Sequence, residues 1–174
     1  MSVLLIDGRS GSGKTELAAA IVAAWPEAQL VRLDDIYPGW DGLEAGSRYV
    51  TDFVLDGPLR RWQRWDWYAD DRAEWHEIDP ALPIVIEGVG ALSRANRERA
   101  DYGIWVETDD ATRKHRATTR DGDLYDGHWD QWARQEQAFI DREHPARLAD
   151  SIVFGHNVGV GADRWRAIVE AAAG

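Results

Sequence analysis

Cysteine is absent from this chain of 174 residues, so the protein has neither a disulfide framework nor a thiolate metal site. No apolar run approaches the roughly 20 residues that a membrane-spanning helix needs. The chain also begins directly with a short apolar segment, without a basic, leader-like stretch. These absences predict a cytoplasmic protein that has no membrane partner.

Positive charge is also scarce. The net charge is −11, and of the 20 basic residues only Lys14 and Lys114 are lysines. This balance argues against nucleic acid as the main partner, so an anionic ligand must be held by local positive charge. A hydrophobic content of 44% and the absence of repeats or linkers predict a single α/β domain over residues 1–174. The composition does not predict an oligomeric state.

One stretch carries a specific signal. Residues 8–15 read G-R-S-G-S-G-K-T and match G-x-x-x-x-G-K-[ST], the phosphate-binding P-loop. Glycines let backbone N–H groups converge on an anion, the following helix directs its positive end there, and lysine adds a mobile charge. The threonine hydroxyl is a ligand for Mg²⁺. The predicted nucleotide-binding residues are Gly8, Arg9, Ser10, Gly11, Ser12, Gly13, Lys14 and Thr15.

Apolar runs that alternate with helical patterns predict a parallel sheet. The expected strands cover residues 3–6, 29–33, 83–88, 102–106 and 151–154. The expected helices cover residues 17–25, 91–99, 109–120, 129–144 and 165–172. Two shorter helices are also expected. One is capped by Ser47 and buries Val50, Phe53 and Val54, and the other begins at Pro58 and turns Leu59 and Trp62 inward. We expect a hairpin over 65–78, and Glu136 on the same helical face as Trp132 and Phe139.

Acidic residues follow two of the expected strands. Because ligands bind at the carboxyl ends of parallel strands, Asp34 and Glu87 are expected near the phosphates. With Thr15 they form the candidate Mg²⁺ site, and Asp34 is also the candidate base for an acceptor hydroxyl. Asp35 competes with Asp34, since adjacent side chains diverge and only one faces the phosphates. Ordinary caps or strand-end acids are the alternative interpretation.

A basic helix precedes a polar, glycine-bearing stretch. Arg116 and Arg120 share a face, and they are candidate catalytic cations in a lid over residues 113–127. A solvated basic face is the alternative. Tyr37 and Trp40, with Asp35, are candidate acceptor contacts, although core packing explains aromatic residues equally well. The five histidines show no metal-ligand spacing.

The chain resembles the uridine kinase-like group of P-loop kinases in residues 6–15, 33–37 and 84–88, and more weakly in 116–121. The resemblance implies a P-loop kinase fold: a five-stranded parallel sheet of order 2-3-1-4-5, flanked by helices, with an arginine-bearing lid. It also implies ATP, Mg²⁺ and an acceptor hydroxyl activated by Asp34. Residues 38–43 depart from the Asn-Phe-Asp-His-Pro-like run of uridine kinases, and the lid arginines are spaced differently.

The sequence therefore predicts an ATP-dependent small-molecule kinase, with a nucleoside or nucleoside-like acceptor as the first hypothesis. Two alternatives stay open. One is a kinase for a nucleoside monophosphate or for a non-nucleoside metabolite such as pantothenate, and the other is an ATP-binding regulatory switch. No base-reading motif separates ATP from GTP.

Overall fold

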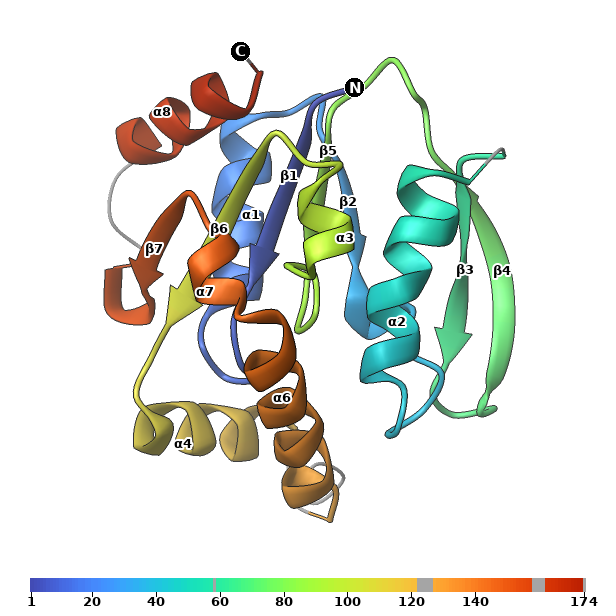
Figure 1. Ribbon diagram of the computed structural model, residues 1–174, viewed down its shortest axis with the longest axis vertical. Helices are drawn as coiled ribbons and strands as arrows, with labels where there is room; N and C mark the ends of the chain where they lie inside the picture. The colour runs from blue at the N-terminus through green and yellow to red at the C-terminus, as the bar shows by residue number, and fades with distance from the viewer. Residues whose placement is uncertain (58, 122–126, 158–161, 174) are drawn as a thin grey trace.

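The computed structural model describes residues 1–57, 59–121, 127–157 and 162–173. Its centre is a sheet of five parallel strands in the order β2-β5-β1-β6-β7. These strands are β1 (Val3–Asp7), β2 (Gln29–Arg32), β5 (Ile84–Glu87), β6 (Tyr102–Glu107) and β7 (Ser151–Phe154). Figure 1 shows that they run in one direction, so their carboxyl ends share one edge.

The labels of the strands depend on an inserted hairpin. Strands β3 (Arg61–Asp66) and β4 (Asp71–Glu77) pair antiparallel as a separate sheet of two strands. The expected order 2-3-1-4-5 counted only the parallel strands. With the hairpin numbered in chain order, the third parallel strand becomes β5, and the observed order is β2-β5-β1-β6-β7.

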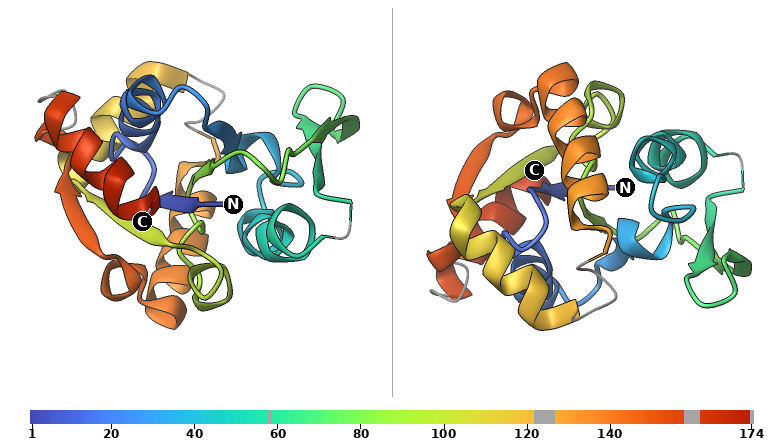
Figure 2. Two further views of the ribbon diagram at one scale, coloured as in Figure 1. Left: turned by 90° about the horizontal axis from the view of Figure 1, so that it is seen from above. Right: turned by 90° about the horizontal axis from the view of Figure 1, so that it is seen from below.

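Helices cover both faces of the sheet (Figure 2). They are α1 (Lys14–Ala24), α2 (Leu43–Tyr49), α3 (Arg94–Arg97), α4 (Asp110–Asp121), α6 (Trp129–Glu143), α7 (Pro145–Leu148) and α8 (Ala162–Ala173). Leu4 and Ile6 of β1 join a core cluster with α1 and α8, whereas Val3 and Leu5 join a second cluster with α2 and α6. This alternation follows from the two-residue period of a strand, and it buries the sheet on both faces.

Shorter turns complete the chain between these elements. Two are 3₁₀ turns, η1 (Leu33–Asp35) and η3 (Gly155–Asn157), and one is a π-helical turn, η2 (Val50–Leu55). The turn η1 follows β2 directly and places two aspartates at the carboxyl edge of the sheet. Within the described residues, no helix is both long and apolar enough to cross a membrane.

Several expected elements are confirmed. Asp109 accepts a hydrogen bond from the backbone N–H of Thr112 at the start of α4, as its predicted capping role requires. The helix α6 ends before Pro145. The hairpin expected over 65–78 is present, although it begins earlier, at Arg61.

Other expectations about local structure are wrong. No helix follows residue 58, because Arg61–Asp66 is extended and pairs with β4; Trp62 is buried as expected, but Leu59 is 62% exposed. Ser47 lies inside α2, where its hydroxyl donates to the carbonyl of Gly90 instead of capping the helix. Phe53 is largely exposed. The helix expected over 91–99 shortens to α3, which Ser93 caps.

Candidate active site

The P-loop joins β1 to α1, and three glycines determine its shape. Gly11 and Gly13 have φ values of 76° and 102°, a region that residues with a Cβ rarely adopt. A Cβ at Gly11 would lie 2.2 Å from the carbonyl oxygen of Arg113, and one at Gly8 would lie 2.5 Å from that of Val106. The loop is thus packed directly against β6 and α4, and a side chain at either glycine would displace it.

Lys14, the first residue of α1, folds back over this loop. Its Nζ donates to the carbonyl oxygen of Arg9 at 3.2 Å, and the residue is buried. Burial raises the pKa of Asp7 and of Glu87, and the positive charge of Lys14 partly opposes this rise. A buried ammonium group among glycine backbone is the arrangement that a nucleotide phosphate requires.

Thr15 and Glu87 meet beside the loop. The Thr15 hydroxyl donates to Glu87 Oε1 at 3.2 Å, and Glu87 is only 2% exposed. Burial raises the pKa of Glu87, the charge of Lys14 lowers it, and that of Asp34 raises it further. These hard oxygen donors fit Mg²⁺. Among the described residues no group of three or more His, Cys, Asp or Glu side chains could hold a metal ion by itself. Mg²⁺ usually keeps several waters and is bound by one or two carboxylates together with phosphate oxygens.

The adjacent acids Asp34 and Asp35 lie in different surroundings, as expected. Asp34 is exposed, and its charge raises the pKa of Glu87 and of Tyr37. Burial raises the pKa of Asp35, and the charge of Asp34 raises it further, whereas Arg32, Arg64 and His76 lower it. The charges that lower the pKa of Asp35 thus include those of Arg64 on β3 and His76 on β4, whereas the charge of Asp34 also acts on Glu87 and Tyr37.

Asp7, the last residue of β1, is a buried acid whose role the sequence did not reveal. Its carboxylate accepts hydrogen bonds from the backbone N–H groups of Gly8 (2.6 Å), Gly90 (3.1 and 3.2 Å) and Leu92 (2.8 Å). Burial is the largest influence and raises the pKa of Asp7 to about 7, against the effect of these donors. Asp7 ties the start of the P-loop to the loop after β5.

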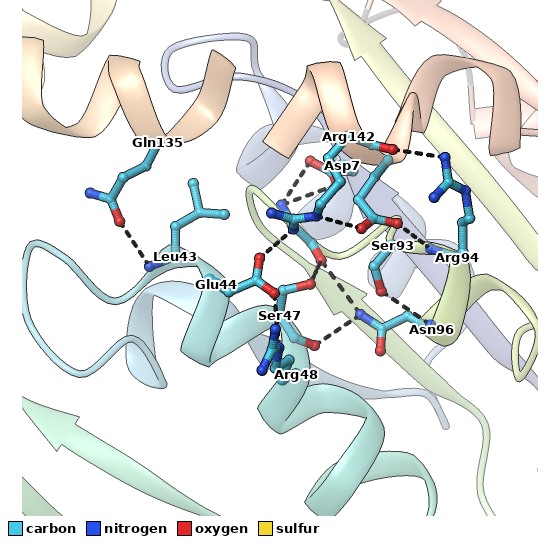
Figure 3. Close-up of polar contacts among 12 residues, drawn as sticks. Asp7, Leu43, Glu44, Ser47, Arg48, Ser93, Arg94, Asn96, Gln135 and Arg142 are labelled. Carbon is cyan, nitrogen blue, oxygen red and sulfur yellow. Dashed lines mark hydrogen bonds and ion pairs between the residues drawn. The ribbon is translucent and has the colours of Figure 1, made fainter. Parts of the chain in front are cut away.

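A second polar network fixes the same loop from the other side (Figure 3). Asn96 Nδ2 donates to the carbonyl oxygens of Ser47 and Ala91, both at 3.1 Å. The Ser47 hydroxyl donates to the carbonyl oxygen of Gly90 at 2.7 Å. The segment that follows Glu87 is therefore held by β1, α2 and α3 together, which keeps the candidate Mg²⁺ ligand in place.

Tyr37 is part of the core and not of an open acceptor surface. It is 1% exposed, its hydroxyl donates to the carbonyl oxygen of Val89 at 2.6 Å, and its ring packs edge-on against Trp132. Both its polar and its apolar parts are occupied, so the predicted acceptor contact is replaced by a structural role.

Trp40 belongs to an aromatic cluster beside Asp34. Its ring stacks on His128 with centroids 4.4 Å apart, and it lies 5.1 Å from Trp67. Trp67 is 40% exposed, and its Nε1 donates to the carbonyl oxygen of Asp34 at 2.8 Å. The cluster joins the loop after η1, the hairpin and the start of α6.

The expected lid arginines are only partly described. Arg116 is exposed on α4, and its guanidinium lies near Gly155. The side chain of Arg120 and residues 122–126 lie outside the described part, so the lid over 113–127 stays a prediction. Arg113, on the same helix, is 2% exposed and donates from Nη1 to the carbonyl oxygen of Ser10 at 3.0 Å. Arg113 therefore contacts the P-loop and not solvent.

Glu136 of α6 completes the contacts of the loop. It is 1% exposed and accepts hydrogen bonds from the backbone N–H of Ser10 at 2.8 Å and from Arg9 Nε at 3.2 Å. An acid between Trp132 and Phe139 on the buried face of a helix is a visible signal in the sequence, but it does not say what the acid contacts.

Comparison with known proteins supports the fold. No family model matches the chain, and no curated protein matches its sequence. Solved structures do match: one described as a possible uridine kinase from Bacillus stearothermophilus has a TM-score of 0.59 and 19% identity, with 87% of each chain covered. A sugar kinase from Janibacter sp. HTCC2649 has a TM-score of 0.57 and 13% identity over 99% of this chain and 94% of that one. Shikimate kinase from Acinetobacter baumannii has a TM-score of 0.54 and 17% identity over 98% and 92%.

These neighbours all have P-loop kinase-like folds, and the chain shares that fold. The named kinases differ in their acceptors, and identities below 20% do not transfer one acceptor to this chain. The acceptor must be inferred from the residues at its own site.

Proposed function

We propose that this chain is an ATP-dependent small-molecule kinase, which transfers the γ-phosphate of ATP to an acceptor hydroxyl. One observation carries the proposal: an exposed carboxylate, Asp34, lies in η1 at the sheet edge where Thr15 is hydrogen-bonded to the buried Glu87, and its charge acts on Glu87. A regulatory switch needs the loop and the metal ligands, but it has no need for a second acid toward an open surface.

Each group has a role in this reaction. The P-loop N–H groups and Lys14 bind phosphate oxygens, and Thr15 and Glu87 would hold Mg²⁺, directly or through water. A bound Mg²⁺ neutralises charge on the phosphates as the bond to the leaving oxygen breaks. We assign Arg116 and Arg120 to the same task on the transferring group.

Asp34 acts on the acceptor. Its carboxylate orients the hydroxyl and takes its proton as the new oxygen–phosphorus bond forms, and ADP leaves with the electrons of the broken bond. Asp35 is less suited to this role, because its charge is compensated by Arg32, Arg64 and His76.

The surroundings of Asp34 favour a flat, uncharged acceptor, with a nucleoside first. Trp67 donates to the backbone of Asp34, and Trp40 packs against Trp67. Arg64, the β3 arginine near Asp35, is hydrogen-bonded to Glu74 and Asp66. A nucleoside monophosphate would need a cation for its phosphate, so it and a pantothenate-like metabolite are the second candidates.

The test is ADP release from ATP, or GDP release from GTP, with a panel of nucleosides, nucleoside monophosphates, sugars, shikimate and pantothenate. We expect one class to raise the rate well above the rate without acceptor. If no acceptor raises ADP release and the protein still binds ATP, the kinase proposal fails and the switch becomes the better account.

A further inference from the structure

Buried charged side chains hold both the backbone N–H and the backbone carbonyl of Ser10, within the P-loop. Its N–H donates to Glu136 Oε1 at 2.8 Å, and its carbonyl oxygen accepts from Arg113 Nη1 at 3.0 Å. The two side chains come from α6 and α4, far from the loop in sequence. Arg9, the preceding loop residue, adds a hydrogen bond from Nε to Glu136 at 3.2 Å.

We propose that Glu136 and Arg113 are positioning residues of the nucleotide site. They hold the backbone N–H and carbonyl of Ser10 and so keep the P-loop in its phosphate-binding shape. The inference rests on the proposed function, because it assumes that the loop binds a nucleotide. Neither residue needs to touch the phosphates. They act through the backbone of the loop.

The energetics favour a functional arrangement over a stabilising one. Glu136 and Arg113 are 1% and 2% exposed, and the closest charged atoms lie 3.8 Å apart, beyond an ordinary hydrogen bond. The Arg113 Nε is buried and has no hydrogen-bond partner among the described residues. Buried charges cost stability unless they are fully satisfied. Arg113 also pairs with Asp110 and Glu136 with Arg9, so the remaining cost comes from the unpartnered Nε and from the long Arg113–Glu136 separation.

The positions of the two helices extend the argument. Both α4 and α6 lie beyond the carboxyl edge of the sheet (Figure 1), and they flank residues 122–126 in the chain. Gly11 also rests against the carbonyl of Arg113, where even a Cβ would come within 2.2 Å. A change in the loop that moved Ser10 or Gly11 would therefore disturb contacts with both helices.

The experiment measures ADP affinity, from tryptophan fluorescence, together with the melting temperature without nucleotide. Glu136→Ala removes every acceptor for the Ser10 N–H, whereas Glu136→Gln keeps one oxygen and loses the charge. Asp141→Asn, on an exposed position of the same helix, is the matched control. Ile84→Val, buried at the opposite end of the sheet, controls for lost stability alone.

We expect Glu136→Ala to weaken ADP binding about tenfold or more, because one charged hydrogen bond to the loop is lost. Glu136→Gln is expected to lie between it and the wild type, and both controls to stay within about twofold. Arg113→Met combined with Glu136→Gln should lose less than the product of the single effects, because both side chains hold the backbone of one residue, Ser10.

Two outcomes overturn the inference. The first is a Glu136→Ala protein with a lower melting temperature that still binds ADP within about twofold of the wild type, which would make the pair structural only. The second is an Ile84→Val protein that loses as much affinity for the same fall in melting temperature. Failure of the proposed function is distinct, since the wild-type protein would then show no acceptor-dependent ADP release, whatever the ADP affinities of the variants.

Discussion

The two sides of the active-site edge are built in different ways. On the nucleotide side the polar side chains are buried and tied to backbone: Asp7, Lys14 and Glu136 are 0%, 9% and 1% exposed. On the acceptor side Asp34 is exposed. It lies beside Trp67, a residue of the projecting hairpin that also carries the fully exposed Tyr68. The first side is fixed by the sheet and its helices. The second is formed by a loop and an insertion, of which Trp62 and Ile78 pack into the core.

The sharpest test of this division is Asp34→Asn. Asn keeps the volume and one oxygen but cannot take a proton, so acceptor-dependent ADP release should fall ~10²–10⁴-fold. Nucleotide affinity, measured by tryptophan fluorescence, should stay close to that of the wild type. Asp35→Asn is the matched control. If the Asp35→Asn protein is inactive and the Asp34→Asn protein is active, Asp35 and not Asp34 is the base.

Lys14→Ala tests the nucleotide side. The lysine stabilises charge that develops on the transferring phosphate, so the rate should fall ~10²-fold or more. Circular dichroism should show an intact fold. Lys114→Ala, the other lysine and exposed on α4, should retain the wild-type rate. Near-normal turnover after the loss of Lys14 would contradict the P-loop assignment.

The burial of Asp7 predicts a pH dependence of stability. Its pKa in the folded protein is raised from 3.8 to about 7, so the folded state binds a proton that the unfolded state releases. The stabilising contribution of Asp7 is therefore fully present below pH 3.8. As the pH rises from there to about 7, the free energy of unfolding loses this contribution at up to ~1.4 kcal/mol per pH unit.

The measurement is urea unfolding between pH 4 and pH 8 for the wild type and Asp7→Asn. Asn does not titrate, so the difference between the two free energies of unfolding isolates the Asp7 term from the other acids. A difference that does not change with pH would show that Asp7 is ionised in the folded protein throughout this range.

The smallest effect is expected on the acceptor side. Trp67→Phe keeps an aromatic ring but loses the hydrogen bond to the carbonyl of Asp34. One such bond contributes about 0.5–1.5 kcal/mol, so the acceptor KM should rise about 2–10-fold with the KM for ATP unchanged. Trp75→Phe, also half-exposed on the hairpin, is the control. A rise in the KM for ATP instead of the acceptor KM would contradict the assignment of Trp67 to the acceptor side.

Local patterns in the sequence point to the P-loop and the strand-end acids, whereas the contacts that hold these residues are long-range. The P-loop, the strand-end acids and the divergence of Asp34 from Asp35 depend on local patterns, in which spacing determines geometry. The contact of Glu136 with Ser10 joins residues 126 positions apart, so it has no local signature. The core position of Tyr37 depends on Trp132 and Val89, and no local pattern contains them. The strand at Arg61–Asp66 was misread because Pro58 resembles a helix start.

The position of the hairpin in the chain has a consequence for how this protein can acquire a new specificity. The acceptor-side features Asp34, Trp40 and Trp67, and the whole hairpin, come from the segment between β2 and β5. From elsewhere in the chain, His128 and Trp132 also pack against Trp40. Much of the acceptor side is thus encoded by one continuous segment of the chain. Recombination can exchange this segment as a unit and leave the phosphate-binding residues on both sides of it unchanged.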